Sequence, residues 1–91
     1  MTEQQARHIM EILKQDKSHK SGHYHYGYIH LYYDRNKKMF VKKHEDLSVN
    51  IYDPTITYKY LTDEEMIAYL IRYYQYDEMI KYFKAYYSME F

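Results

Sequence analysis

The stretch H-Y-H-Y-G-Y-I-H-L-Y-Y, residues 23–33, is the densest aromatic run in this chain of 91 residues. With the alternation of a β-strand, one face carries Tyr24, Tyr26, Tyr28, His30 and Tyr32, and the other carries His23, His25, Gly27, Ile29, Leu31 and Tyr33. Neither face is plainly polar, which is typical of a central strand, or of a strand between a helical core and a binding partner. The sequence therefore predicts a sheet organised around this stretch.

The length of this strand predicts an interruption at Gly27. Eleven residues would span roughly 36 Å at about 3.3 Å each, whereas most strands have about five or six residues. An interior glycine favours a bulge, a bend or a close backbone approach. A turn is expected at residues 34–38, and further strands at residues 39–44 and 47–52. Asp53 and Pro54 end the third strand, so residues 56–60 are expected to form a short fourth strand or an extended connector.

Helices are expected on both sides of the strands. Residues 2–17 have an amphipathic pattern with Thr2 as N-cap, and residues 16–22 are polar and end in Gly22, which predicts a loop. Thr62 and Glu65 form a capping-box pattern that starts a second helix. If one straight helix continued, at about 100° per residue, the apolar residues after Asp77 would point roughly 160° away from the apolar stripe before Tyr74. One helix would then face two opposite cores, so a break is predicted between Tyr74 and Glu78.

These elements predict a small single α+β domain over residues 1–91, with the order α-β-β-β-α-α and a three-stranded antiparallel sheet packed by helices. A chain of this length can form a single core, in which on the order of 60 to 65 per cent of its unfolded surface is buried.

Charge and cysteine content exclude several classes of function. Thirteen basic and thirteen acidic residues cancel, which argues against non-specific nucleic-acid affinity, although residues 1–46 carry nine basic against six acidic residues and residues 47–91 carry four against seven. Without cysteines there is no disulfide framework and no thiolate zinc site. No membrane span or signal peptide is recognised, so a cytoplasmic location is expected. The fifteen tyrosines indicate either a tyrosine surface or the codon bias of an AT-rich genome.

Candidate catalytic and metal-binding residues are few. The pair His23 and His25 could share a metal on one strand face, but no H-E-x-x-H or thiolate pattern accompanies it, so neither a metal nor a cofactor is expected. Side chains of the types that serve as general acids and bases in metal-independent ribonucleases are His25, His44, Tyr28 and Lys43.

Two nucleic-acid families share features with this chain. Ser21-Gly22-His23, with the preceding helix and the following strands, resembles the HicA family of ribonuclease toxins, whose motif runs Gly-Ser-His; the resemblance implies a catalytic histidine at His23. The helix and strand order also resembles the double-stranded RNA-binding domain. That family opens its last helix with lysines that bind phosphates, whereas Asp63, Glu64 and Glu65 open the helix here, which excludes this function.

The remaining hypothesis is protein interaction, because tyrosine is enriched at interfaces. The predicted contact combines tyrosines and acidic residues of the last two helices, namely Tyr69, Tyr73, Tyr76, Asp63, Glu64, Glu65, Asp77 and Glu78. The alternative binding face comprises Tyr24, Tyr26, Tyr28, Tyr32 and Lys42, which could stack single-stranded bases.

The function predicted from the sequence is a phage or mobile-element inhibitor that blocks a host nucleic-acid-processing or defence protein. The predicted α-β-β-β-α-α order resembles a small anti-CRISPR protein, which implies occlusion of a DNA-binding cleft through an acidic surface. No enzymatic activity, membrane partner or direct nucleic-acid binding is expected, and a homodimer stays open. The alternatives are the tyrosine platform for single-stranded nucleic acid and the small metal-independent ribonuclease toxin.

Overall fold

The computed structural model describes residues 1–91 apart from Tyr24, Ile51 and the side chain of His23. In chain order the elements are α1 (Glu3–Leu13), β1 (His19–His23), β2 (Gly27–Asp34), β3 (Met39–Asp46), β4 (Thr55–Leu61), α2 (Asp63–Tyr73) and α3 (Tyr76–Tyr87). The prediction of an α+β fold with an antiparallel sheet is confirmed, but the sheet has four strands, so the predicted three-stranded sheet is wrong.

The helices begin and end at residues that the local sequence marks. Thr2 caps α1 and Thr62 caps α2, in each case with a reciprocal capping box that satisfies free backbone N–H groups of the first turn. The first helix ends at Leu13, four residues before the predicted limit. The predicted separation of the last two helices is confirmed, since α2 ends at Tyr73 and α3 begins at Tyr76.

The extra strand is β1, which lies where the sequence predicts a loop. It pairs antiparallel with β2, and the sheet order β1-β2-β3-β4 follows the chain. The prediction failed because this strand depends on distant partners. His19 is only 7% exposed, and its ring packs against Tyr82 and Phe83 of α3. Polar residues with little β-propensity thus form a strand through tertiary contacts.

The aromatic stretch is a hairpin and not one strand. β1 ends at His23 and β2 begins at Gly27, which has a φ of +119°. A Cβ on Gly27 would lie 2.1 Å from the carbonyl oxygen of Glu45 in β3. The predicted close approach at this glycine is therefore present, but it lies beside a turn and not within a strand.

The predicted strand at residues 47–52 is also wrong for the described residues, which form bends between β3 and β4. The Asp46 side chain accepts hydrogen bonds from the backbone N–H and the hydroxyl of Ser48, and the Asn50 side chain accepts one from the Tyr52 N–H. Such local bonds compete with pairing in a sheet. Ile51 lies outside the described residues, and β4 starts after Pro54 with seven residues.

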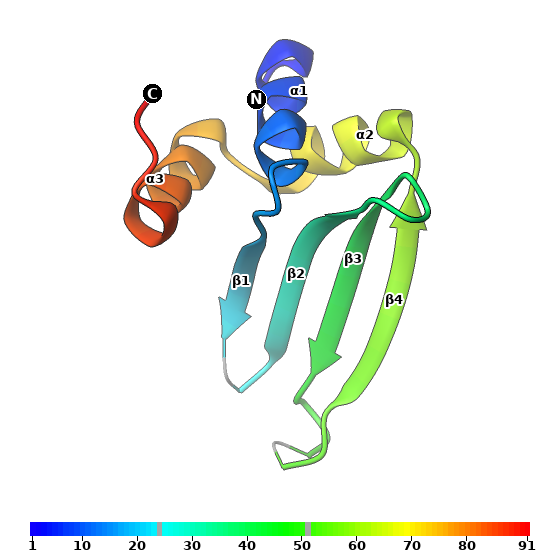
Figure 1. The fold of residues 1–91 in the computed structure, drawn as a ribbon. Helices are drawn as coiled ribbons and strands as arrows, with labels where there is room; N and C mark the ends of the chain where they lie inside the picture. The colour runs from blue at the N-terminus through cyan, green and yellow to red at the C-terminus, as the bar shows by residue number, and fades with distance from the viewer. Residues whose placement is uncertain (24, 51) are drawn as a thin grey trace.

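One core joins the helices to one face of the sheet. Leu31, Phe40 and Leu61 of the sheet are buried together with apolar residues of all three helices, among them Ile9, Leu70 and Phe83. Figure 1 shows the helices gathered at one end of the sheet, with the four strands projecting away from them. None of the helices in the described part of the chain has the length and apolarity needed to cross a bilayer.

Candidate functional site

The sheet face opposite the helices is the main candidate surface. The pairing register aligns its outward side chains in three rows across the strands: Tyr32, Val41 and Tyr60; Lys20, His30, Lys43 and Tyr58; and Gly22, Tyr28, Glu45 and Ile56. We call this set of residues the tyrosine face. The described helices contribute their buried residues to the other side of the sheet.

Val41 shows how this face is built. It is fully buried, yet it does not belong to the core shared with the helices. Its cross-strand neighbours on this face are Tyr32 and Tyr60, so tyrosine side chains, and not a helix, shield it from water. Desolvation, followed by the nearby Tyr58, Tyr60 and Asp34, raises the pKa of Tyr32. The rings still offer contact area, because Tyr58 is 55% exposed and Tyr60 is 38% exposed.

The charges in the centre of the tyrosine face largely compensate one another. Glu45 Oε1 lies 3.2 Å from His30 Nε2 and 3.6 Å from Lys43 Nζ, although the His30 contact lacks the geometry of a hydrogen bond. Burial lowers the pKa of His30, Glu45 opposes this, and Lys20 and Lys43 lower it further. The neutral imidazole is therefore favoured beside a lysine and carboxylate pair.

Two other lysines lie over tyrosine rings near the margins of this face. Lys20 Nζ is 4.2 Å from the ring centroid of Tyr28, and Lys37 Nζ is 4.5 Å from that of Tyr60. Both distances are within the range of a cation–π interaction, which contributes about 0.5 to 1 kcal/mol at exposed sites. They hold the cations at the edges of the face.

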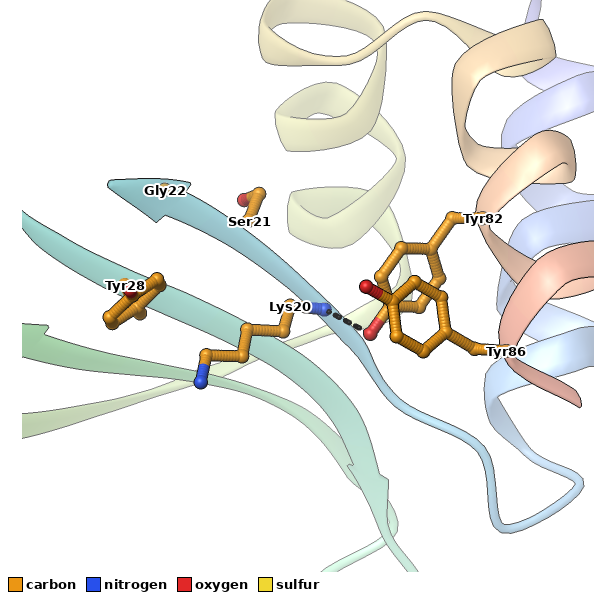
Figure 2. Close-up of a pocket in the computed structure, with 6 residues that line it drawn as sticks. All are labelled: Lys20, Ser21, Gly22, Tyr28, Tyr82 and Tyr86. Atoms are coloured by element: carbon orange, nitrogen blue, oxygen red, sulfur yellow. Dashed lines mark hydrogen bonds between the residues drawn. The ribbon is translucent and has the colours of Figure 1, made fainter. Parts of the chain in front are cut away.

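A hollow of about 390 Å³ adjoins the tyrosine face at β1. Its lining residues are Lys20, Ser21, Gly22, Tyr28, Tyr82 and Tyr86. Figure 2 shows Lys20 of β1 reaching toward Tyr28, while Tyr82 and Tyr86 project from α3 on the other side. The rings of Tyr82 and Tyr86 stack with centroids 4.3 Å apart, so the wall on the α3 side is aromatic.

The predicted contact on the last two helices is divided into separate groups. Tyr69 and Tyr73 pack with ring centroids 5.0 Å apart, and Lys42 lies over the Tyr69 ring. Burial, followed by the nearby Tyr74, raises the pKa of Tyr69. Tyr76 instead bonds through its hydroxyl to the ring of His8 on α1.

The acidic residues of that predicted contact lie in two places. Asp63, Glu64 and Glu65 form the first turn of α2, whereas Asp77 and Glu78 lie in the first turn of α3. Between the two groups lies the rest of α2, a helix of eleven residues that is roughly 16 Å long at about 1.5 Å per residue. The Glu65 side chain is already engaged as an acceptor of the Thr62 N–H.

The alternative binding face is divided between the two sides of the sheet. Tyr28 and Tyr32 belong to the tyrosine face, but Lys42 points to the helix side, where it contacts Tyr69. Tyr26 lies in the turn between β1 and β2 and is 74% exposed. Tyr24 lies outside the described residues.

The sequence reasoning missed Ile56, Tyr58 and Tyr60 as members of the candidate surface. Their alternation with Thr57 and Lys59 is a signal for a strand that presents these three side chains on one face. The sequence left residues 56–60 open between a short fourth strand and an extended connector, so their tyrosines were not assigned to the same face as those of β2.

The candidate acid–base residues do not converge on one point. His44 faces the helix side of β3, whereas Lys43 and Tyr28 belong to the tyrosine face, and His25 lies in the β1–β2 turn. Among the described residues, no three histidine, aspartate or glutamate side chains are grouped as metal ligands. The His23 side chain, and with it the His23 and His25 pair, lies outside the described part.

Comparison with known proteins yields no match for this chain among family models, curated proteins or solved structures.

Proposed function

We propose that this protein is a small non-enzymatic interaction module that blocks a larger protein by covering it with the tyrosine face. The observation that carries this proposal is a sheet face of partly exposed tyrosines on the side opposite the described helices. Tyrosine provides large, amphipathic contact area with few rotors to immobilise. The hollow beside Lys20 and Tyr82 offers a place for one anchoring side chain of the partner.

The charge of the tyrosine face favours a protein partner over nucleic acid. The lysines of the face are Lys20 and Lys43, and Lys37 lies beside it. Lys43 is paired with Glu45. Nucleic-acid affinity depends on cations that are free to neutralise phosphates. Of these three lysines, only Lys20 and Lys37 have no carboxylate partner within the face. This number is small for a surface that must follow a phosphate backbone.

The partner class we propose is a host protein that processes nucleic acid or acts in defence, with a phage or mobile element as the carrier. Small size and the separation of the candidate acid–base residues support a blocking role over an enzymatic one. The fourth strand removes the match in element order to the anti-CRISPR protein. The tyrosine face, and not that resemblance, is therefore the basis of the proposal.

Capture from host lysate, with and without nuclease, tests this function when combined with matched tyrosine variants. Tyr28→Ala removes a ring from the tyrosine face, whereas Tyr73→Ala removes an exposed ring from α2. If Tyr28 is a central contact, its loss should weaken binding to the captured protein by about 2 kcal/mol or roughly 30-fold, with Tyr73→Ala near wild type. The reverse pattern would refute the tyrosine face and favour the helical contact.

A single-stranded nucleic-acid platform is the second candidate, supported by the placement of Lys20 over Tyr28 and Lys37 over Tyr60. Two phosphate contacts, one to each of these lysines, would make affinity for a single strand fall roughly sevenfold between 50 and 200 mM salt. If the captured partner disappears after nuclease treatment, and an oligonucleotide binds with this salt dependence, the platform replaces the inhibitor.

A further inference from the structure

The two edges of the sheet are treated differently by the rest of the molecule. At β1, α3 supplies hydroxyl groups to the edge: the Lys20 N–H donates to the Tyr82 hydroxyl at 3.2 Å, and the Ser18 N–H donates to the Tyr87 hydroxyl at 3.0 Å. The Tyr87 hydroxyl also donates to the Ser18 carbonyl. These contacts satisfy edge groups that would otherwise pair with another chain.

The β4 edge has a different character. This strand reads T-I-T-Y-K-Y-L, and every residue from Thr55 to Tyr60 is exposed. Within the described residues, the sheet order places only β3 beside it, and Figure 1 shows it at the margin opposite β1. β-Branched and aromatic residues favour strand pairing, and Lys59 is the single charge of the seven. Such an edge is a template for adding a strand.

The sequence of β4 is complementary to itself in the antiparallel direction. A twofold axis at Tyr58 pairs all seven residues, with Ile56 opposite Tyr60, Thr57 opposite Lys59 and Tyr58 opposite its own copy. Apolar residues then meet on the tyrosine face, and no like charges lie opposite each other. Moving the axis to Lys59 would shorten the overlap and place two lysines in opposition.

We propose that two copies of this chain associate through antiparallel β4 strands centred on Tyr58. Every second residue of β4 points its backbone N–H and C=O away from β3. Between the two copies these groups would form about six to eight hydrogen bonds. The two sheets would continue into one of eight strands, with the tyrosine faces side by side. The inference does not depend on the proposed function, since a dimer can form whether or not the tyrosine face binds a partner.

Single cysteine variants test the register directly, because the natural chain has no cysteine. In the proposed dimer the two Tyr58 positions lie about 4.5 to 5.5 Å apart between Cα atoms, within the range of a disulfide. The two Ile56 positions lie about 14 Å apart, since four residues separate them along the strands. Tyr58→Cys should form a covalent dimer under mild oxidation at least roughly tenfold faster than Ile56→Cys, which is on the same strand face and is 45% exposed.

A mixture of Ile56→Cys and Tyr60→Cys supplies the matching positive control. These positions face each other across the proposed dimer, so the mixed disulfide should form while each variant alone stays largely uncrosslinked. Equal crosslinking of Tyr58→Cys and Ile56→Cys would overturn the register.

Sedimentation equilibrium of the unmodified chain tests association without any cysteine. The dimer should appear with rising concentration, Tyr58→Lys should abolish it, and mixing Tyr58→Lys with Tyr58→Glu should restore it through opposite charges. A chain that stays monomeric up to about 1 mM would overturn the proposal, as would a dimer unaffected by Tyr58→Lys. Binding of an extended segment of another protein by a monomeric chain would assign the edge to that partner instead.

Discussion

The buried imidazole of His19 should make the stability of this protein depend on pH below neutrality. The ring lies among Tyr74, Tyr82 and Phe83, with no protein partner for Nδ1 among the described residues. Burial lowers the pKa of His19 from 6.5 to about 4. Because the unfolded chain then binds the proton more readily, the contribution of His19 is fully present above pH 6.5 and is lost as the pH falls toward 4.

The size of the effect follows from these two pKa values. Full protonation would cost about 3 kcal/mol, and at pH 5 the loss should already be about 2 kcal/mol. This is a large share of the 5 to 15 kcal/mol typical of small domains. Urea denaturation at pH 7 and pH 5 measures it as a change in the free energy of unfolding.

His19→Phe is the matched variant, because it keeps an aromatic ring without a titratable nitrogen. Its loss of stability between pH 7 and pH 5 should be smaller than that of wild type by about 2 kcal/mol. His19→Leu provides a second neutral side chain if the phenyl ring fits poorly. Equal pH dependence in wild type and in both variants would refute the assignment of a buried neutral imidazole to His19.

Two further substitutions test the local features that define the elements. Thr62→Ala should lower the stability by about 1 kcal/mol, or the melting temperature by about 4 to 8 °C, because a helix cap is lost. Thr55→Ala, at the exposed start of β4, should change the melting temperature less. Equal shifts in the two variants would show that the loss does not come from the helix cap. Gly27→Ala should cost about 1 to 3 kcal/mol in urea denaturation through its positive φ and the approach of the Glu45 carbonyl, and a variant as stable as wild type would contradict the close packing of β2 on β3.

The helices could be predicted because their signals are local. The capping box at Thr62 and Glu65 lies within four residues, and the change of apolar direction between Leu70 and Phe83 lies within one short segment. Neither signal requires knowledge of a distant partner. This is why the start of α2 and the break before α3 were both predicted correctly.

The strands could be predicted only where their side chains alternate clearly. β1 consists of H-K-S-G-H, and its place in the sheet depends on pairing with β2 and on the rings of α3 around His19. Residues 47–52 have apolar alternation but also Asp46 and Asn50, whose side chains form local turns. Long-range contacts decide the first case and local hydrogen bonds decide the second.

The candidate site was only half predictable for the same reason. Tyr28 and Tyr32 could be assigned to one strand face from the sequence, but their neighbours on that face come from β3 and β4. The pairing of Tyr32 with Val41, and of Val41 with Tyr60, requires the register of three strands. Lys42 was assigned to the wrong face of the sheet because the register of β3 was unknown.

The position of the helices explains why tyrosine is the residue of this surface. With the described helices packed on the other face, the apolar atoms around Val41 must be covered by side chains that also tolerate water. Leucine or phenylalanine would leave a purely apolar patch, whereas the tyrosine hydroxyl can remain hydrated while the ring covers Val41. The function we propose would use the same property, since the rings of Tyr28 and Tyr60 lie beneath Lys20 and Lys37 and still offer contact area. Covering this side of the sheet and, in the function we propose, contacting a partner therefore depend on one set of residues.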